Sequence, residues 1–559
     1  MGEGTVIRPK SRVTVWCLIA ILSIAASGPA AQAQGKKTST RGNVDAIKAQ
    51  QLKEYLYFVA SDEMEGRDTP SRGLDLTAKF IALNLALWGV KPGGENNSYF
   101  QKISLRKGKV DPKATSANVN GTAMVLGEDF IPRPTPGSVS GSMTYVGSGW
   151  YYPAKGINPY KGIDVKDKIA IIAGTGFPRG LSFNDLRAAK EGVDFESPLG
   201  YLKKNGARGA LLVASPSANF ALELQRSVER GSNWQPEKLL KEDARPIPSI
   251  TISQKVARQL LEGEARAGDD LAKALTSVET GEAFNLSASK QAKFEIGMTY
   301  EQSYTQNVIG IVEGSDAKLK NEYVAVGAHY DHVGVRNPGS GSSGPGEDMI
   351  FNGADDDGSG TVAVMAMAEA FAKGTTHPRR SLLFVWHAGE EKGLWGSQYV
   401  TDFPVVPVDQ IVTQLNIDMI GRSRDANDKN PANADLTGPN EVYVIGSKMM
   451  STELGVLSEA VNDSFLKLTF NYKYDDPKDP QRFFYRSDHY NYARKGIPII
   501  FYFSGVHQDY HRPSDHPDKI DYAKMEKIAR TVMATAWELG NRATRPKVDK
   551  QLSTEFMAN

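Results

Sequence analysis

Histidine and carboxylate side chains gather in a few short motifs of this chain. All eight histidines lie between residues 329 and 516. The same region holds a His-x-Asp at His329 and Asp331, three adjacent aspartates at 355–357, and the pair Glu390 and Glu391. Neutral imidazole and ionised carboxylate together are the ligands that divalent metal ions take in proteins. The concentration of these residues therefore predicts a metal site.

The first two motifs lie beside expected secondary structure. His329 and Asp331 are two residues apart at a strand end, so both are expected on one face, with His332 on the other face in a structural role. The aspartates at 355–357 precede a helix, where one aspartate would suit the N-cap. Three adjacent carboxylates repel one another unless a cation lies among them, so we favour metal ligation over capping alone.

Three further acids and one further histidine fit the same interpretation. The side chains of Glu390 and Glu391 diverge, so one can bind metal while the other accepts a proton from water, as metal-assisted hydrolysis requires. Asp418 ends an apolar strand, where a lone acid is unusual unless it is paired or metal-bound. His511 lies in a loop, and it gains interest because it also follows the carboxyl end of a strand.

An alternating pattern of strands and helices must position these residues. Two helices are expected over 44–59 and 78–87. Strands are predicted over 307–312, 323–328, 381–386, 414–419, 441–445 and 497–503, with helices over 358–373, 452–462 and 522–539. This alternation predicts an α/β fold, a mostly parallel mixed sheet flanked by helices. Sheets of this kind carry their sites at the carboxyl ends of the strands.

The middle of the chain has a different texture. Residues 119–280 contain short apolar strands, many glycines and one amphipathic helix, but no histidine and no acidic cluster. We interpret this segment as a binding or lid module and not as a second active site. The total of 559 residues also exceeds one ordinary core, so at least two domains are expected.

The first 33 residues have the pattern of a secretory signal peptide. A basic start is followed by an apolar run over 13–26, and Ala31-Gln32-Ala33 provides small residues for cleavage before Gln34. The protein is therefore expected to be exported, to a periplasmic or extracellular location, and to lack a membrane anchor after cleavage. Cys17, the only cysteine, lies in this signal, so the mature protein has no thiol ligand and no disulfide.

Net charge limits the classes of partner. The formal charge of +1 gives no reason to expect nucleic acid or an anionic membrane surface as a partner. No feature of the sequence specifies an oligomeric state.

Five motifs together resemble a known family. In chain order they are GAHYDHVG, NGADDDGSG, HAGEEKGLWGS, NIDMIGR and YHRPSDHPDKID. They are similar to those of the M28 family of co-catalytic zinc peptidases, which includes secreted bacterial aminopeptidases. The similarity spans 44–118 and 285–545, while 119–280 resembles the protease-associated (PA) domain that is inserted in many members.

The resemblance implies a ligand set. It implies two Zn²⁺ ions, although Co²⁺ or Mn²⁺ could occupy the same ligands. His329 and Asp418 would bind one ion, and Glu391 and His511 would bind the other. Asp356, the middle aspartate of the three, would bridge both.

The resemblance also implies supporting roles. Glu390 would be the general base and acid, and Asp331 would orient and polarise His329. Asp488 resembles an acid that supports the site from behind the ligands. The tyrosine with which some members stabilise an oxyanion has Tyr485 as its candidate. A cis peptide bond is suggested between Asp356 and the next residue.

The function that follows is that of a secreted di-zinc exopeptidase acting on peptides, and the family favours an aminopeptidase that removes N-terminal residues. Two alternatives remain on the same grounds. One is a glutaminyl cyclase-like acyltransferase with a single zinc, and the other is a receptor-like binding protein without catalysis. The metal content distinguishes the three, since it would be two, one or no ions per chain.

Overall fold

The computed structural model describes residues 41–173, 176–187, 189–241, 246–264, 283–336 and 347–552. The predicted signal peptide, its cleavage position and Cys17 lie outside these residues. From Arg41 onward the described chain belongs to one compact unit. Within the described part of the chain, no helix has both the length and the apolar character needed to cross a bilayer.

The larger sheet has ten strands in the order β18-β17-β19-β16-β14-β15-β13-β2-β9, with β1 beside β13. Its centre, β19-β16-β14-β15, is parallel, and the pairs outward from it on either side include antiparallel ones. The strands are β1 (Lys91–Pro92), β2 (Phe100–Val110), β9 (Gln235–Pro236), β13 (Met298–Val312), β14 (Tyr323–His329), β15 (Ser381–His387), β16 (Ile411–Ile417), β17 (Glu441–Ile445), β18 (Thr469–Asn471) and β19 (Ile499–Phe503). The predicted mixed α/β sheet is confirmed.

The central strands are buried on both faces. In β15, Leu382 and Phe384 belong to one apolar cluster, while Leu383 and Val385 belong to another on the opposite face. Successive side chains of a strand point to opposite faces, so a continuous apolar run fits a strand covered on both sides. This explains why the central segments read as unbroken hydrophobic stretches.

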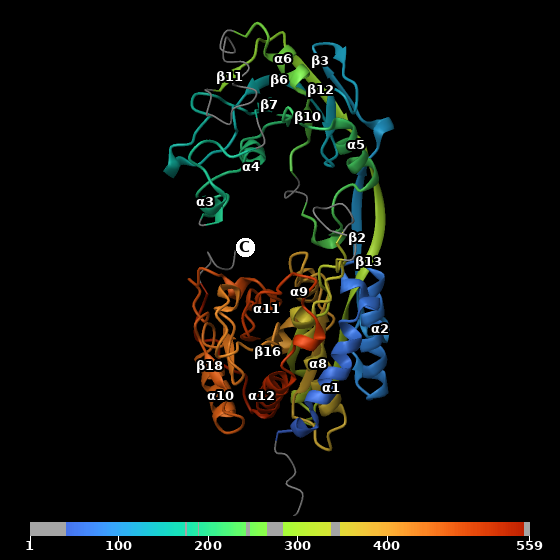
Figure 1. Cartoon of the computed structure of the whole chain (residues 1–559), viewed down its shortest axis with the longest axis vertical. Helices are drawn as coiled ribbons and strands as arrows, with labels where there is room; N and C mark the ends of the chain where they lie inside the picture. The colour runs from blue at the N-terminus through green and yellow to red at the C-terminus, as the bar shows by residue number, and fades with distance from the viewer. Residues whose placement is uncertain are drawn as a thin grey trace, which may run out of the picture. The chain divides into compact units, whose positions relative to one another are not determined.

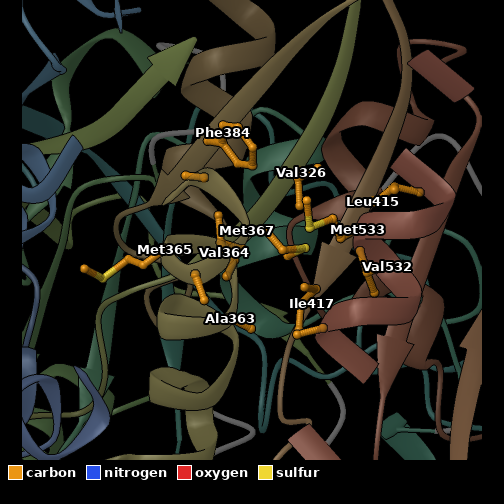
Figure 2. Packing of buried hydrophobic residues seen from close by; sticks show 14 of the residues in the cluster. Val326, Ala363, Val364, Met365, Met367, Phe384, Leu415, Ile417, Val532 and Met533 are labelled. Carbon is orange, nitrogen blue, oxygen red and sulfur yellow. The ribbon is translucent and has the colours of Figure 1, made fainter. Parts of the chain in front are cut away.

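Helices cover both faces of this sheet. Helices α1, α8 and α12 pack against one another, and α12 also contacts α10, while α9 and α11 form a second pair (Figure 1). The helices are α1 (Ala49–Val59), α2 (Arg72–Leu87), α8 (Gly360–Ala372), α9 (Trp395–Asp402), α10 (Thr452–Asp463), α11 (His489–Ala493) and α12 (Tyr522–Asn541). Figure 2 shows Met367 of α8, Met533 of α12 and Val326 of β14 in one buried cluster.

The smaller sheet has nine strands in the order β4-β3-β12-β6-β7-β8-β10-β5, with β11 beside β6. They are β3 (Ser116–Val119), β4 (Thr122–Ala123), β5 (Phe130–Pro132), β6 (Gly137–Tyr145), β7 (Ile169–Ile172), β8 (Gly209–Val213), β10 (Ser249–Ile252), β11 (Phe284–Asn285) and β12 (Gln291–Ile296). Helices α3 (Phe183–Arg187), α4 (Pro198–Lys204), α5 (Phe220–Glu229) and α6 (Gln254–Leu261) accompany it. Its first strand begins at Ser116, just before the predicted insertion of 119–280, and its last strand ends at Ile296, well beyond it.

Three segments of the chain link the smaller sheet to the larger one. Strand β2 leads to β3 and β12 leads to β13, and β2 and β13 pair along their length from Phe100 with Val308 to Val110 with Met298. A returning segment adds β9 to the edge of β2. Beside it, Trp234 packs on a small cluster that includes Tyr399 of α9. The smaller sheet is thus fixed to the larger one at three points of the chain.

Candidate metal centre

The predicted site residues meet at the carboxyl ends of parallel strands. His329 ends β14, Asp418 follows β16, and the pair 390–391 follows β15. Asp356 lies just before α8, and His511 lies in the loop between β19 and α12. The structure brings the five predicted ligands into two groups that share one aspartate.

The first group consists of His329, Asp356 and Asp418. Nε2 of His329 lies 3.2 Å from Oδ1 of Asp356 and 3.6 Å from Oδ1 of Asp418. All three residues are buried. This group therefore presents one imidazole and two carboxylates to a single point at the sheet edge.

The second group consists of His332, Asp356, Glu391 and His511. Nε2 of His511 lies 3.0 Å from Oδ2 of Asp356 and 3.1 Å from Oε2 of Glu391. Nδ1 of His332 lies 2.8 Å from the other oxygen of Glu391. Asp356 therefore directs one oxygen to each group, which is the arrangement that a bridging ligand needs.

The prediction that His332 points away from the site is wrong. The prediction extended the alternation of a strand beyond His329, but β14 ends at that residue. The backbone then turns, and the amide of His332 donates to the carbonyl of Arg67 over 3.1 Å. The turn carries the imidazole of His332 into the second group.

The three adjacent aspartates make different contacts. Only Asp356 enters the metal groups. Asp357 accepts hydrogen bonds from the amides of Gly360, at the start of α8, and Met419, over 2.9 and 3.1 Å. Asp355 accepts from the amide of Gly421 over 2.6 Å. A hydrogen bond to the helix start and a candidate metal ligand thus lie on neighbouring residues. The peptide bond between Asp356 and Asp357 is cis, as the resemblance suggested.

Glu390 lies beside both groups without belonging to either. Its Oε2 is 4.0 Å from Nε2 of His329. Burial raises the pKa of Glu390 well above its usual range, and the nearby carboxylates of Glu391 and Asp418 add to this, although His329 opposes it. A carboxylate with a raised pKa next to a metal centre suits proton transfer near neutral pH.

Asp331 connects the His329 strand to the Glu390 loop. Nδ1 of His329 lies 3.1 Å from the backbone carbonyl oxygen of Asp331, and 3.7 Å from its carboxylate. The carboxylate instead accepts hydrogen bonds from the amide of Glu390 over 3.1 Å and from the hydroxyl of Thr69 over 3.0 Å. The main chain of Asp331 is therefore closer to His329 than its carboxylate is.

Arg67 is a structural residue of the site that the sequence interpretation missed. Its guanidinium is fully buried and donates to the carbonyls of Val59, Tyr330, Asn352 and Gly353 over 2.7–2.9 Å. Burial lowers its pKa to about 10, partly offset by the site's carboxylates. One buried cation thus holds the segment after β14 to the loop before the aspartates. An arginine in a polar loop gave no local signal of this contact.

Asp488 supports the site from α11. It is fully buried, and its Oδ2 lies 3.2 Å from Nδ1 of His387 at the end of β15. Nε2 of the same imidazole lies 3.0 Å from the hydroxyl of Tyr492. Burial acts to raise the pKa of Asp488, but the nearby imidazoles of His387 and His329 outweigh it and lower the pKa. Its contact in the structure is thus with His387, which is not a candidate ligand, and the supporting role of Asp488 stays a prediction.

The residues present fit divalent metal ions. Nε2 of His329 is buried and has no hydrogen-bond partner among the described residues, although carboxylate oxygens surround it. Burial opposes a charge on His511, yet the carboxylates of Asp356 and Glu391 raise its pKa to about 10. Buried carboxylates that converge on imidazole nitrogens need positive charge between them. Mixed nitrogen and oxygen donors suit Zn²⁺.

A small apolar cavity opens beside the first group. Tyr510, Phe483, Phe501, Phe503 and Val506 line it together with ligands of both groups. The ring of Tyr510 also stacks on His511, with 4.0 Å between the ring centres. Tyr485 does not line this cavity. It lines a second cavity, and Arg486 belongs to the lining of both. Tyr510, directly before a predicted ligand, is therefore better placed than Tyr485 to reach a substrate at the metals.

Fold and donor set together define an α/β protein with a histidine–carboxylate metal centre. Residues 307–536 match Peptidase family M28. That segment holds every candidate ligand.

Curated relatives and solved structures give further similarities. The chain is 27% identical over 241 residues to a probable leucine aminopeptidase of Trichophyton verrucosum (strain HKI 0517), covering 42% of this chain and 57% of that protein. It is 26% identical over 280 residues to leucine aminopeptidase 2 of Trichophyton rubrum, covering 45% of this chain and 49% of that protein. The chain thus spans about half the length of these relatives.

The solved structures are more distant in sequence. An aminopeptidase from Aneurinibacillus sp. strain AM-1 matches with a TM-score of 0.48 and 17% identity, over 92% of this chain and 98% of that one. A zinc aminopeptidase from Bacillus subtilis matches with a TM-score of 0.44 and 17% identity, over 88% of this chain and 95% of that one.

Proposed function

We propose that this protein is an exported di-zinc exopeptidase, and specifically an aminopeptidase that removes N-terminal residues from peptides. The observation that carries the proposal is the shared carboxylate: Asp356 directs its two oxygens into two separate ligand groups, with Glu390 beside them. The match of 307–536 to Peptidase family M28 and the relatives named leucine aminopeptidases support it. The single-zinc and metal-free alternatives give no role to a second complete group.

The residues have distinct tasks in this proposal. His329 and Asp418 hold one ion, Glu391 and His511 hold the other, and Asp356 joins them. Zinc supplies Lewis-acid chemistry when bound, since it polarises a carbonyl oxygen and acidifies water. Glu390 accepts a proton from the attacking water and passes it to the amine of the leaving peptide. Its raised pKa and its position outside the ligand groups suit this shuttle.

The cavity beside the first group bears on how an unblocked peptide would bind. Phe483, Phe501 and Phe503 line it beside Arg486, and its volume is only about 30 Å³, so leucine is proposed from the relatives named leucine aminopeptidases. Glu390, the one carboxylate among the described residues lining this cavity that belongs to neither ligand group, suits the positive α-ammonium group of an unblocked peptide. In this proposal the hydroxyl of Tyr510, which lines the same cavity, donates a hydrogen bond to the oxyanion that forms during hydrolysis.

We further propose that the segment 119–280 is an inserted PA domain that restricts access to the site. A cavity of about 870 Å³ is lined by Lys107, Arg230 and Trp234 and reaches Glu391. The part of a peptide beyond the scissile bond would lie in such a space. Export rests on the predicted signal peptide, and the N-terminal sequence of secreted protein tests it, with Gln34 as the expected first residue.

Hydrolysis of paired substrates tests the proposed activity. The mature protein should contain two zinc ions per chain and should cleave leucine p-nitroanilide. N-acetyl-leucine p-nitroanilide should not be cleaved, because the α-ammonium group is absent. Cleavage of the blocked substrate at the same rate, release of C-terminal residues from blocked peptides, or a single ion per active chain would each contradict the proposal.

A further inference from the structure

One imidazole at the centre lies outside the five ligands that the motif resemblance implies. His332 is fully buried and belongs to the second group with Asp356, Glu391 and His511. Its Nδ1 lies 2.8 Å from Oε1 of Glu391 and 3.7 Å from Oδ2 of Asp356. The same two carboxylates flank Nε2 of His511, so two imidazoles face one pair of acids.

The surrounding chain is built to hold this imidazole in place. Gly353 has a positive φ of 56°, and a Cβ at that position would lie 2.5 Å from Cδ2 of His332. Glycine is thus required both by the backbone and by the ring that packs on it. The rings of His332 and His511 meet edge to face, with 5.6 Å between their centres. The backbone bond from His332 to the carbonyl of Arg67 fixes the other end.

The two groups consequently differ in the number of protein donors. The first offers three side chains, His329, Asp356 and Asp418, and the second offers four. With zinc, three protein ligands leave a position for water or substrate, whereas four protein ligands are typical of sites that hold the ion tightly. The shared aspartate counts in both groups, so the difference is due to His332.

We propose that His332 is a sixth protein ligand, which binds the ion held by Glu391 and His511 and makes that ion the more tightly bound of the two. The proposal rests on the two-metal site proposed above and adds an asymmetry to it. The ion of the second group is then retained when the ion of the first group has been removed. The first group, with fewer protein donors, exchanges its ion first.

Metal retention during stepwise chelation tests this inference. Wild-type protein should lose its two zinc ions at clearly different chelator concentrations, measured by elemental analysis of the dialysed protein. In His332→Ala the more resistant ion should become at least about tenfold easier to remove, since even residues that only support a ligand change affinity by about 10–100-fold. His489→Gln, which alters a buried imidazole outside both groups, should match wild type.

A spectroscopic measurement on the wild type avoids any folding defect of a variant. With ¹¹³Cd in both positions and ¹⁵N-labelled histidine, one cadmium signal should couple to two imidazoles and the other to one. One imidazole at each cadmium, or unchanged ion retention in a folded His332→Ala, would overturn the inference. Neither result would affect the proposed peptidase activity, which wild-type cleavage of leucine p-nitroanilide reports separately.

Discussion

The two sheets of this protein share a layout but differ at one edge. Both contain consecutive parallel strands, β19-β16-β14-β15 in the larger and β6-β7-β8-β10 in the smaller. In the larger sheet, strand ends lead to His329 and Asp418, whereas β7 and β8 lead to Ala173 and Ala214. Parallel strands therefore provide an edge where a site can form, and a few residues at that edge decide whether one does.

The difference extends to the buried charge. Asp355, Asp356, Asp357 and Asp488 are all buried behind the larger sheet's edge, while the apolar cluster of the smaller sheet is built from residues such as Phe294 and Leu211. Burying charge costs free energy unless it is paired or bound to metal. The larger sheet should therefore depend on metal for stability, and the smaller one should not.

The largest expected effect separates two adjacent residues of the larger sheet's edge. Glu390→Gln should lower kcat by about 10²–10⁴-fold, because it removes a proton acceptor, while both ions remain bound. Glu391→Gln should instead lower zinc content and melting temperature together, with partial recovery of activity in excess zinc. Turnover, bound zinc and melting temperature of the two proteins provide the measurement. Loss of metal in Glu390→Gln with retention in Glu391→Gln would reverse the assigned roles.

Removal of metal should destabilise the larger sheet and leave the stability of the smaller sheet unchanged. An ion present at about 1,000 times its dissociation constant stabilises the folded state by about 4 kcal/mol. Chelation should therefore reduce hydrogen-exchange protection in β14 and β16 and leave β7 and β8 unchanged. Mass spectrometry of peptides from the two sheets measures this. Equal losses in both sheets would show that metal stabilises the whole unit and would remove the contrast.

Low pH should also destabilise the part of the protein that contains the larger sheet. The smaller sheet contains no histidine, whereas burial lowers the pKa of His489 in α11 to about 3. The unfolded chain binds this proton near pH 6.5 and the folded chain does not, so stability is complete above pH 6.5 and falls as the pH decreases towards 3. The loss should approach about 1.4 kcal/mol per pH unit for this proton.

Denaturant unfolding of His489→Gln between pH 7 and 4 checks this expectation. The variant should lose less stability than wild type over that range. His377→Gln, at a partly exposed histidine, provides the matched control and should follow wild type. A variant whose pH profile coincides with that of wild type would show that His489 does not contribute.

The smallest expected effect concerns the segment that joins the sheets. Trp234 lines the cavity that reaches Glu391, so Trp234→Ala should raise KM for peptides of four or more residues by roughly three- to tenfold, about 1 kcal/mol. KM for leucine p-nitroanilide should hardly change, because that substrate does not extend into the cavity. Trp150→Ala, in another cluster of the smaller sheet, is the control. Equal effects on both substrates would argue against a role in access.

Regular patterns explain what the sequence could predict. The central strands and α8 consist of long apolar runs, so their existence followed from hydrophobicity alone. Boundaries were less accurate: β13 begins at Met298 and not at 307, since its polar half pairs with β2 outside the apolar core. The clustering of five ligands also followed, because each comes after a strand end or before a helix.

Long-range contacts explain what the sequence could not predict. His332 was misplaced because strand alternation stops where the strand stops, and nothing local marks that residue. Arg67 contacts the carbonyl of Asn352, far away in the chain, through a hydrogen bond that no periodicity encodes. Tyr510 was passed over because its value depends on a cavity formed by residues of several elements.

The pairing of β2 with β13 determines when the candidate site can form during synthesis. Phe100 and Val308 are partners, so the ten-stranded sheet cannot close until the whole smaller sheet has left the ribosome. Thr69 and Arg67, from before that segment, then meet Asp331 and Asn352, from after it. Contacts between such distant parts form late in folding. The candidate site is therefore incomplete while the chain is being made, and it can form only when synthesis has passed His511, the last candidate ligand.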